Sequence, residues 1–198
     1  MPNKALVTDA RPGSARDRLL AAANELFYEE GVHTVGIDRV IERAGVAKAS
    51  LYNTFGSKEE LIREYLAGRQ ATLRARITRE LAARFDTPRA KLIGLFEIQG
   101  ESFARPGYRG CAFVGASVES RPGGCEEKAS ADYRGWLRSL ITELATDAGA
   151  ADPAGLAQQL VFLYDGASIS AWLDHNRDAA EQAQLMATLL VQSALGEA

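Results

Sequence analysis

The chain has 198 residues, of which 46% are hydrophobic and 25% are charged, a composition typical of a globular protein with a sizeable core. Its net charge of -3 at pH 7 argues against a protein that coats nucleic acid without specificity. No uncharged segment is long enough to cross a bilayer and the start of the chain lacks a secretory pattern, so we expect a cytoplasmic protein with no membrane partner.

The first element that the sequence predicts is a helix preceded by an arm. Residues 1–13 contain two prolines and a glycine without any apolar period, which is typical of a flexible arm. Ser14 can cap a helix over about 15–30, where apolar residues recur at three-to-four spacing. Gly31 is suited to end this helix because glycine adopts backbone angles that other residues avoid.

Two short helices follow, near 37–44 and 48–54. Gly45 lies between them and permits the left-handed backbone of a tight turn. Ser57 begins a Ser-Lys-Glu-Glu sequence that resembles a capping box and opens a longer helix. The order of a short helix, a glycine turn and a second short helix is that of a helix-turn-helix, whose second helix enters the DNA major groove.

The rest of the chain also has the pattern of helices. No stretch alternates apolar and polar residues with a period of two, and proline and glycine separate the segments. We expect an all-α fold of about nine helices, in which a three-helix DNA-binding domain, 14–57, is joined to a larger helical bundle, 58–198. The bundle helices are expected near 58–84, 88–104, 112–120, 125–148, 153–175 and 178–195.

Residues in and around the second short helix are the candidates for DNA contact. Short or hydrogen-bonding side chains there suit base edges, and basic or hydroxyl side chains suit phosphates. We expect Ser50, Asn53 and Ala49 to read bases, and Tyr52, Thr54 and Lys48 to hold phosphates. Lys58 lies beside the free amides of a capped helix start, a typical phosphate site. The full candidate set is Thr34, Arg39, Lys48, Ala49, Ser50, Tyr52, Asn53, Thr54 and Lys58.

Residues 16–66 resemble the N-terminal DNA-binding domain of the TetR family of bacterial repressors. The shared patterns are AAxxLFxxxG, which ends at Gly31, and AGVxKxxLYxxFxSKEEL over 44–61. The resemblance implies an all-helical homodimer whose C-terminal domain binds a small-molecule effector and releases a near-palindromic double-stranded operator. It implies a transcriptional repressor, although the sequence leaves activation open and gives neither the operator nor the effector.

Three positions depart from the family pattern. Ala47 replaces the usual serine or threonine cap of the second short helix, a loss that typically costs about 1 kcal/mol. Thr54 replaces a common aromatic residue but keeps a hydroxyl. Gly36 stands where the first short helix is often capped, and Thr34 is expected to compensate.

Aromatic and small residues in the C-terminal part are candidates for an effector cavity. The segment PGYRGCAFVGASVES, 106–120, is a glycine-rich apolar turn that enters a short helix and is similar to a TetR subgroup. We expect an apolar or aromatic effector, and the acidic residues Glu97, Glu101, Glu119 and Asp165 suggest a preference for cations. Core packing is an alternative explanation for each single member of the candidate set, which is Phe96, Phe103, Cys111, Phe113, Val114, Trp136, Phe162 and Trp172.

The last two helices are apolar on more than one face. One face can serve the core of the subunit, and the resemblance implies that the other forms a four-helix dimer interface. Burial of both faces in one large core is the alternative. The candidate interface residues are Leu163, Ala167, Ala171, Ala183, Met186 and Leu190.

Other functional classes receive less support. Ser168 and His175 are too far apart along one helix for a hydrogen bond, so we expect no catalytic residues and no enzyme activity. Two cysteines without clustered histidines predict no metal site, and no nucleotide motif predicts a cofactor. A thiol-based redox regulator using Cys111 and Cys125 stays open, with Arg109 as the group that would lower the pKa of Cys111. A helical adaptor would explain a dimer face but not the residues from Lys48 to Lys58.

Overall fold

The computed structural model describes residues 13–196, and these contain helices and no strand. The predicted arm therefore lies outside the described residues except for Gly13. All of the predicted helices are present within one or two residues of the expected bounds. They are α1 (Ala15–Glu30), α2 (Ile37–Ala44), α3 (Lys48–Phe55), α4 (Lys58–Arg84), α5 (Pro88–Phe103), α6 (Ala112–Glu119), α7 (Cys125–Asp147), α8 (Pro153–Leu173) and α9 (Ala179–Ala194).

The helix ends form for the local reasons that the sequence indicates. The Ser14 hydroxyl accepts a hydrogen bond from the Asp17 backbone N–H, and the Asp17 carboxylate accepts one from Ser14 in return. Ser57 caps α4 by accepting from the backbone N–H of Glu60. Gly45 joins α2 to α3 in the left-handed conformation, with φ 62° and ψ 43°, so the tight turn is confirmed.

The two short helices of the motif begin without side-chain caps. Ala47 precedes α3 and Gly36 precedes α2, and neither start has a capping hydrogen bond from a side chain. The expectation that Thr34 compensates for Gly36 is therefore wrong. The starts of α2 and α3 depend on packing against the neighbouring helices instead of on local capping.

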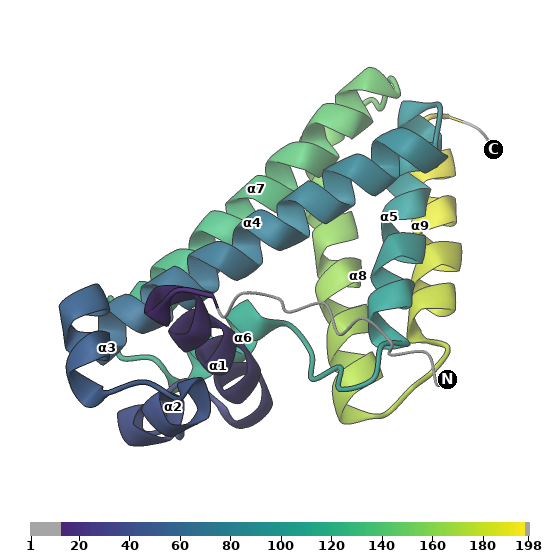
Figure 1. Cartoon of the computed structure of the whole chain (residues 1–198). Coiled ribbons are helices and arrows are strands. Elements are labelled where there is room, and N and C mark those ends of the chain that lie inside the picture. Colours follow the sequence, from purple (N-terminus) through teal and green to yellow (C-terminus); the bar gives the residue numbers. More distant parts are fainter. Residues whose placement is uncertain (1–12, 197–198) are drawn as a thin grey trace, which may run out of the picture.

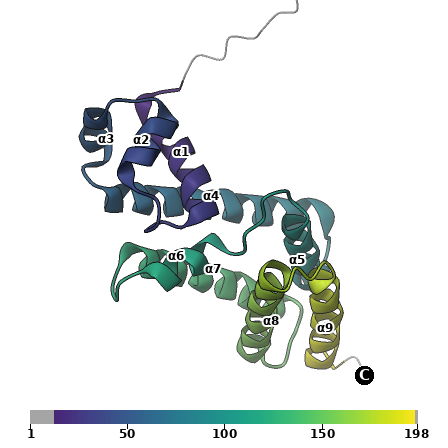
Figure 2. The same cartoon turned by 90° about the horizontal axis from the view of Figure 1, so that it is seen from below.

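The first three helices form a head on one end of the molecule. Helices α1, α2 and α3 pack against one another, α1 and α3 also pack against the N-terminal half of α4, and α4 then runs alongside α7 (Figure 1). Helices α5, α8 and α9 form a bundle at the other end, where α9 packs on both α5 and α8. Figure 2 shows α6 and α7 on the side of α4 away from α3, so α4 lies between two layers.

Two clusters of buried side chains lie along α4. The first cluster belongs to the head, but it also includes Phe113 and Ala116 of α6 and Tyr133 of α7. The second fills the bundle of α5, α7, α8 and α9 and includes Ile77 and Leu81 of α4. Because α4 contributes to both clusters, a displacement of this helix acts on the head and the bundle together.

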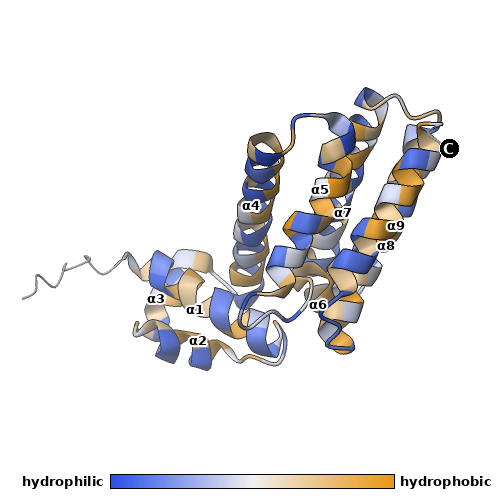
Figure 3. Cartoon of the chain, turned by 90° about the vertical axis from the view of Figure 1, so that its right-hand side faces the viewer, coloured by the Kyte–Doolittle hydropathy of each residue, from blue (hydrophilic) through white to orange (hydrophobic). Residues whose placement is uncertain are grey.

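Helices α8 and α9 contain many apolar residues, seen as orange segments in Figure 3, and several of the large ones are exposed. Two of the expected interface residues are not exposed: Ala167 and Ala183 are buried in the core of the subunit itself. Leu163, Ala171 and Leu190 are partly buried, and Met186 is exposed. The exposed apolar side chains of these two helices are Phe162, Ile169, Trp172, Leu173, Leu185, Met186 and Leu189.

None of the helices in the described part of the chain is both long enough and apolar enough to cross a bilayer.

Candidate functional site

Helix α3 presents a polar face to solvent because its apolar residues are used for packing. Leu51 and Phe55 are buried against the head, and Val46 of the preceding turn is partly buried beside them. The opposite side of α3 is exposed. Residues four apart lie on the same side of a helix, so this face is formed by Lys48 and Tyr52 together with Ala49 and Asn53. Ser50 is partly exposed and Thr54 is exposed at the edge of this face.

Two side chains of α3 already have partners within the head. The Lys48 ammonium lies 2.9 Å from the Asp38 carboxylate of α2, and this hydrogen bond raises the pKa of Lys48. The Thr54 hydroxyl donates to the Ser50 carbonyl at 2.6 Å, within its own helix. A phosphate would therefore compete with Asp38 for Lys48, whereas Tyr52 and Asn53 have no such partner among the described residues.

The other DNA candidates lie away from the exposed face of α3 or have a structural partner. Arg39 of α2 pairs with Glu30 at the end of α1, with a Nη2 to Oε1 distance of 2.9 Å. Thr34 is exposed in the turn before α2. Lys58 is partly buried, with its Nζ 5.9 Å from the ring centre of Phe27, and burial lowers its pKa.

The negative charges near the Lys58 ammonium are carboxylates of α6 and α7. Glu119 at the end of α6 and Glu126 in α7 act on its charge and oppose the effect of burial on its pKa. A phosphate anchor requires an accessible ammonium, so the structure favours a role for Lys58 at the junction between head and bundle. The sequence alone could not indicate this, because the acids come from elements distant in the chain.

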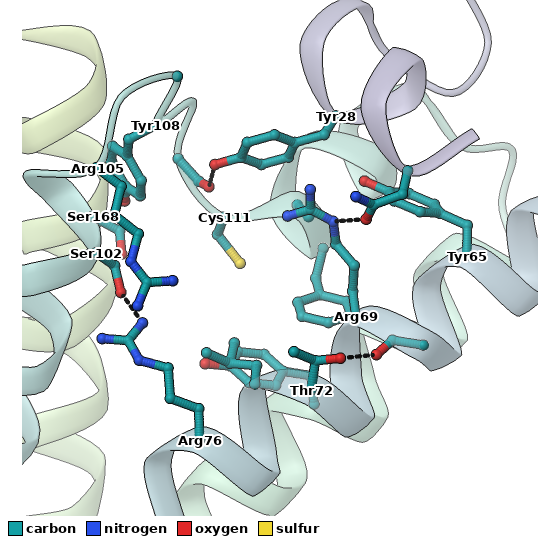
Figure 4. Close-up of a pocket in the computed structure, with 18 of the residues that line it drawn as sticks. Tyr28, Tyr65, Arg69, Thr72, Arg76, Ser102, Arg105, Tyr108, Cys111 and Ser168 are labelled. Atoms are coloured by element: carbon teal, nitrogen blue, oxygen red, sulfur yellow. Dashed lines mark hydrogen bonds between the residues drawn. The ribbon is translucent and has the colours of Figure 1, made fainter. Parts of the chain in front are cut away.

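A cavity of about 630 Å³ lies where the head meets the bundle. This volume is within the range typical of small-molecule sites. Its walls come from α1, α4, α5, the segment before α6, α6 itself, α7 and α8, and Figure 4 shows Tyr28 of α1 facing Arg76 of α4 across it. A molecule bound here would touch the head and the bundle at the same time.

Three of the eight aromatic and small residues expected at an effector cavity line it: Phe103, Cys111 and Phe113. The other five do not. Phe96 is fully buried in the bundle core, and Trp136 and Val114 are partly buried outside the cavity wall. Phe162 is 64% exposed on the outer face of α8, and Trp172 lies beside a smaller hollow near Gly110.

The expected preference for cations is wrong for this cavity. Glu97 and Glu101 pair with Arg84 on the outside of α4 and α5, and Asp165 pairs with Arg134. Glu119 binds the turn between α1 and α2. None of these carboxylates lines the cavity, because each is used in an ion pair or a hydrogen bond elsewhere.

The residues that sequence reasoning missed are polar aromatics and arginines. Five of the six tyrosines of the chain line the cavity, and so do three arginines and Gln99. The arginines of α4 recur among polar residues, a pattern typical of a solvated helix face, so they gave no signal of a site. The tyrosines come from α1, α4, α7, α8 and the segment before α6, and only the fold brings them together: Tyr28, Tyr65, Tyr108, Tyr133 and Tyr164.

Helix α6 connects the cavity to the head. Its first turn, at Cys111 and Ala112, lines the cavity, and its last residue, Glu119, accepts a hydrogen bond at 2.9 Å from the backbone N–H of His33. His33 Nε2 also lies 3.0 Å from the buried carboxylate of Glu126, at the start of α7. A shift of α6 would therefore reach the turn that precedes α2.

The cysteines have the opposite character to that required of a redox sensor. Burial raises the pKa of Cys111, and burial together with Glu126 raises the pKa of Cys125 to about 11. The guanidinium that opposes the shift at Cys111 belongs to Arg134 and not to Arg109 as expected. Both thiols are thus protonated near neutral pH, and the thiolate is the reactive form. The described residues also contain no group of three or more metal-ligating side chains.

The chain is similar to known bacterial regulatory proteins. Residues 19–65 match the family model described as bacterial regulatory proteins, tetR family. The crystal structure of SCO4454, a TetR-family transcriptional regulator from Streptomyces coelicolor, is 31% identical with a TM-score of 0.86, and the match covers 91% of this chain and 96% of that one.

Curated relatives match mainly over the head. The transcriptional activator FasR of Mycolicibacterium smegmatis is 50% identical over 52 residues, 26% of this chain and 22% of FasR. The transcriptional repressor KstR2 of the same organism is 33% identical over 89 residues, 45% of this chain and 43% of KstR2. The chain thus matches less than half the length of each of these two relatives.

Proposed function

Because this chain belongs to the TetR family of bacterial transcriptional regulators, we propose that it binds operator DNA as a homodimer and leaves it when a small molecule fills the cavity. The observation that carries this proposal is the cavity itself, whose wall includes Asn24 and Tyr28 of the head as well as residues of the bundle. An occupant would alter the contacts that set the position of the head.

The DNA contacts of this proposal are made by α3. Its exposed face would enter the major groove, with Asn53, Ser50 and Ala49 against base edges and with Tyr52 and Lys48 against phosphates. On DNA, the Lys48 ammonium would leave the Asp38 carboxylate and bind a phosphate, which is also an anion. Arg39, Thr34 and Thr54 would support the position of the motif or contact the flanking backbone, and Lys58 would act at the junction instead.

The dimer of this proposal forms through α8 and α9. Seven large apolar side chains on these helices are exposed in the single chain, among them Phe162 at 64% and Leu189 at 67%. An exposed apolar patch spread over two neighbouring helices favours burial against a partner, and two such pairs would make a four-helix interface. A two-fold axis there would set the two copies of α3 in successive major grooves.

The coupling runs from the cavity through α4 and α6. An occupant that pushes on Arg69 of α4 or on Cys111 at the start of α6 acts on elements that hold α1 and the turn before α2. Release of DNA then requires only that the ligand bind the displaced form more tightly than the DNA-bound form. We propose repression as the outcome, since the ligand-free dimer is then the DNA-bound state.

Fluorescence anisotropy tests the central claim. The purified protein is titrated onto DNA from its own upstream region and onto a scrambled duplex, over a series of salt concentrations. We expect tight, selective binding to the first duplex and a steep loss of affinity with salt. Equal and weak binding to both duplexes would contradict an operator in that region. A reporter under the same upstream DNA separates repression from activation, because deletion of the regulator raises expression only in the first case.

A further inference from the structure

The cavity carries positive charge although the protein as a whole is acidic. Its lining includes the side chains of Arg69, Arg76 and Arg105 and a single carboxylate, that of Glu64. Glu64 is already paired with Arg16 of the head, at 2.8 Å. With a net charge of -3 for the whole chain, three guanidinium groups around one cavity are a local exception that composition does not predict.

The three arginines differ in how their charge is balanced. Arg76 is fully engaged: it donates to Glu80, to the Ser102 hydroxyl at 2.6 Å and to the Ile98 carbonyl at 2.9 Å. Arg105 follows the end of α5, and its side chain forms no ion pair or hydrogen bond with any residue in 13–196. Figure 4 shows Arg105 directed into the cavity on the side where Arg76 bonds Ser102. Its guanidinium is a cation available to a ligand.

Arg69 is held by neutral groups on the opposite side of the cavity. Its Nε donates to the Asn24 side-chain oxygen at 2.9 Å, and its guanidinium lies 3.8 Å from the ring centre of Tyr28. Both partners belong to α1, and neither supplies a negative charge. Arg69 thus joins α4 to the head through contacts that a negatively charged occupant would weaken by attracting the guanidinium.

The remaining walls indicate the uncharged part of the ligand. Phe103, Phe113 and the tyrosines offer ring faces suited to a flat apolar body. Gln99 is 3% exposed, and its amide nitrogen donates to the Tyr164 carbonyl and to Ser168. The Gln99 amide oxygen has no hydrogen-bond partner among the described residues, so it is a buried acceptor suited to a hydroxyl or N–H of a ligand.

We propose that the effector is an organic anion with an aromatic or similarly flat apolar body, whose acidic group is bound by Arg105 and whose body lies against the tyrosines of the cavity wall. This inference rests on the proposed ligand-responsive function and names the chemical class of ligand. The acidic group replaces the water around Arg105 with a charge-assisted hydrogen bond. Attraction of Arg69 toward the same anion loosens its contacts with Asn24 and Tyr28, which connects binding to the position of α1.

Two dyes that share one ring system test the proposal directly. Anilinonaphthalene sulfonate is an aromatic anion, and N-phenylnaphthylamine has the same rings without the sulfonate; both become fluorescent in apolar sites. Each is titrated against the full chain and against Arg105→Gln, Arg105→Lys and Arg138→Gln. Arg138 is an exposed residue of α7 outside the cavity, so its change removes the same charge elsewhere.

We expect the sulfonate to bind the full chain more tightly than the neutral dye. Arg105→Gln should weaken the sulfonate by about tenfold or more, since hydrogen bonds to charged groups are the strong ones, while the neutral dye keeps its affinity. Arg105→Lys should recover most of the loss, and Arg138→Gln should have no effect. Undetectable sulfonate binding, sulfonate affinity indifferent to Arg105, or equal affinity for both dyes in the full chain would overturn the proposal.

DNA binding is measured separately in the same variants. A failure of the proposed regulatory function can then be distinguished from a failure of the proposed ligand class. Arg105→Gln should keep the DNA affinity of the full chain, which also shows that the variant is folded. Arg105-dependent sulfonate binding that leaves the DNA complex intact would contradict ligand-controlled release but support the ligand class. Selective DNA binding together with equal affinity for the two dyes would support the regulator and overturn the ligand class.

Discussion

The carboxylate of Glu119, the last residue of α6, accepts a hydrogen bond at 2.9 Å from the backbone N–H of His33, in the turn between α1 and α2. The two residues are far apart in sequence, and the bond joins the bundle to the head. The same carboxylate lies so close to Gly31 that a Cβ atom there would overlap Glu119 Oε1. A side chain at position 31 would therefore displace the Glu119 carboxylate from the turn that it holds.

Substitution of Gly31 by alanine should destabilise the protein. Gly31 has a φ of +102°, which alanine rarely adopts, and the added methyl group meets the Glu119 carboxylate. We expect a loss of about 1–3 kcal/mol in the free energy of unfolding, measured by urea denaturation. Gly149→Ala is the matched control, because Gly149 also has a positive φ, +85°, and nothing lies within 4 Å of its added Cβ. Adding Glu119→Ala to Gly31→Ala should recover the steric part of the loss; unaltered stability of Gly31→Ala would contradict the tight approach.

Lys48 and Asn53 should affect DNA binding in different ways. Lys48→Ala removes a proposed phosphate contact, so all sequences should bind more weakly and the salt slope should fall by about 1. Asn53→Ala removes a proposed contact to a base edge, so discrimination at one base pair should fall by about 1–3 kcal/mol. Anisotropy on a set of single-base operator variants measures both, with Arg79→Ala of α4 as a control for lost positive charge. A specificity profile unchanged by Asn53→Ala would remove Asn53 from base readout.

Leu189→Glu should convert a dimer into monomers. Leu189 is 67% exposed in the single chain, so a glutamate there costs the fold of the protomer little but places a charge in the proposed apolar interface. Sedimentation velocity should show a fall from the mass of two chains to that of one, and operator affinity should fall with it. Arg79→Glu, whose side chain is 70% exposed on α4, should leave the mass unchanged. A monomeric wild-type protein would contradict the interface.

The cysteines should be unreactive at neutral pH and reactive only in alkali. Burial raises the pKa of Cys125 from its ordinary value of 9.0 to about 11, so iodoacetamide should label it slowly at pH 7 and faster with each unit of pH. Between about pH 9 and pH 11, Cys125 loses its thiol proton in the unfolded chain but keeps it in the folded chain. The contribution of the Cys125 thiol to the free energy of unfolding is therefore complete below about pH 9 and is lost as the pH rises through about 11.

A double variant tests the redox alternative itself. Cys111→Ser with Cys125→Ser should keep both operator binding and any release by ligand, because neither step uses a thiolate. Release of DNA by a mild oxidant in the unaltered protein, and not in the double variant, would instead support a thiol sensor.

Local patterns along the chain were enough to predict the helices and the motif. Three-to-four spacing of apolar residues, the Ser14 and Ser57 caps and the breaks at Gly31 and Gly45 are local properties, and the structure has all of them within one or two residues of the expected positions. The burial of Leu51 in α3 follows from the same spacing. Exposure of the α3 face follows from local spacing once one side of the helix is known to be buried.

Which apolar face meets which neighbour depends instead on the packing between helices that are distant in the chain. Helices α8 and α9 are apolar on two sides, so spacing could not tell that Ala167 and Ala183 are internal while Phe162 is exposed. Most of the residues that line the cavity could not be predicted either, because they come from elements that are far apart in the chain. Arg69 and Arg105 look like solvated residues in the sequence, and their charges gain significance only because six helices and the segment before α6 enclose a common space around them. The spacing of apolar residues indicates which faces of a helix could be buried. Packing against helices that are distant in the chain determines which of those faces is buried.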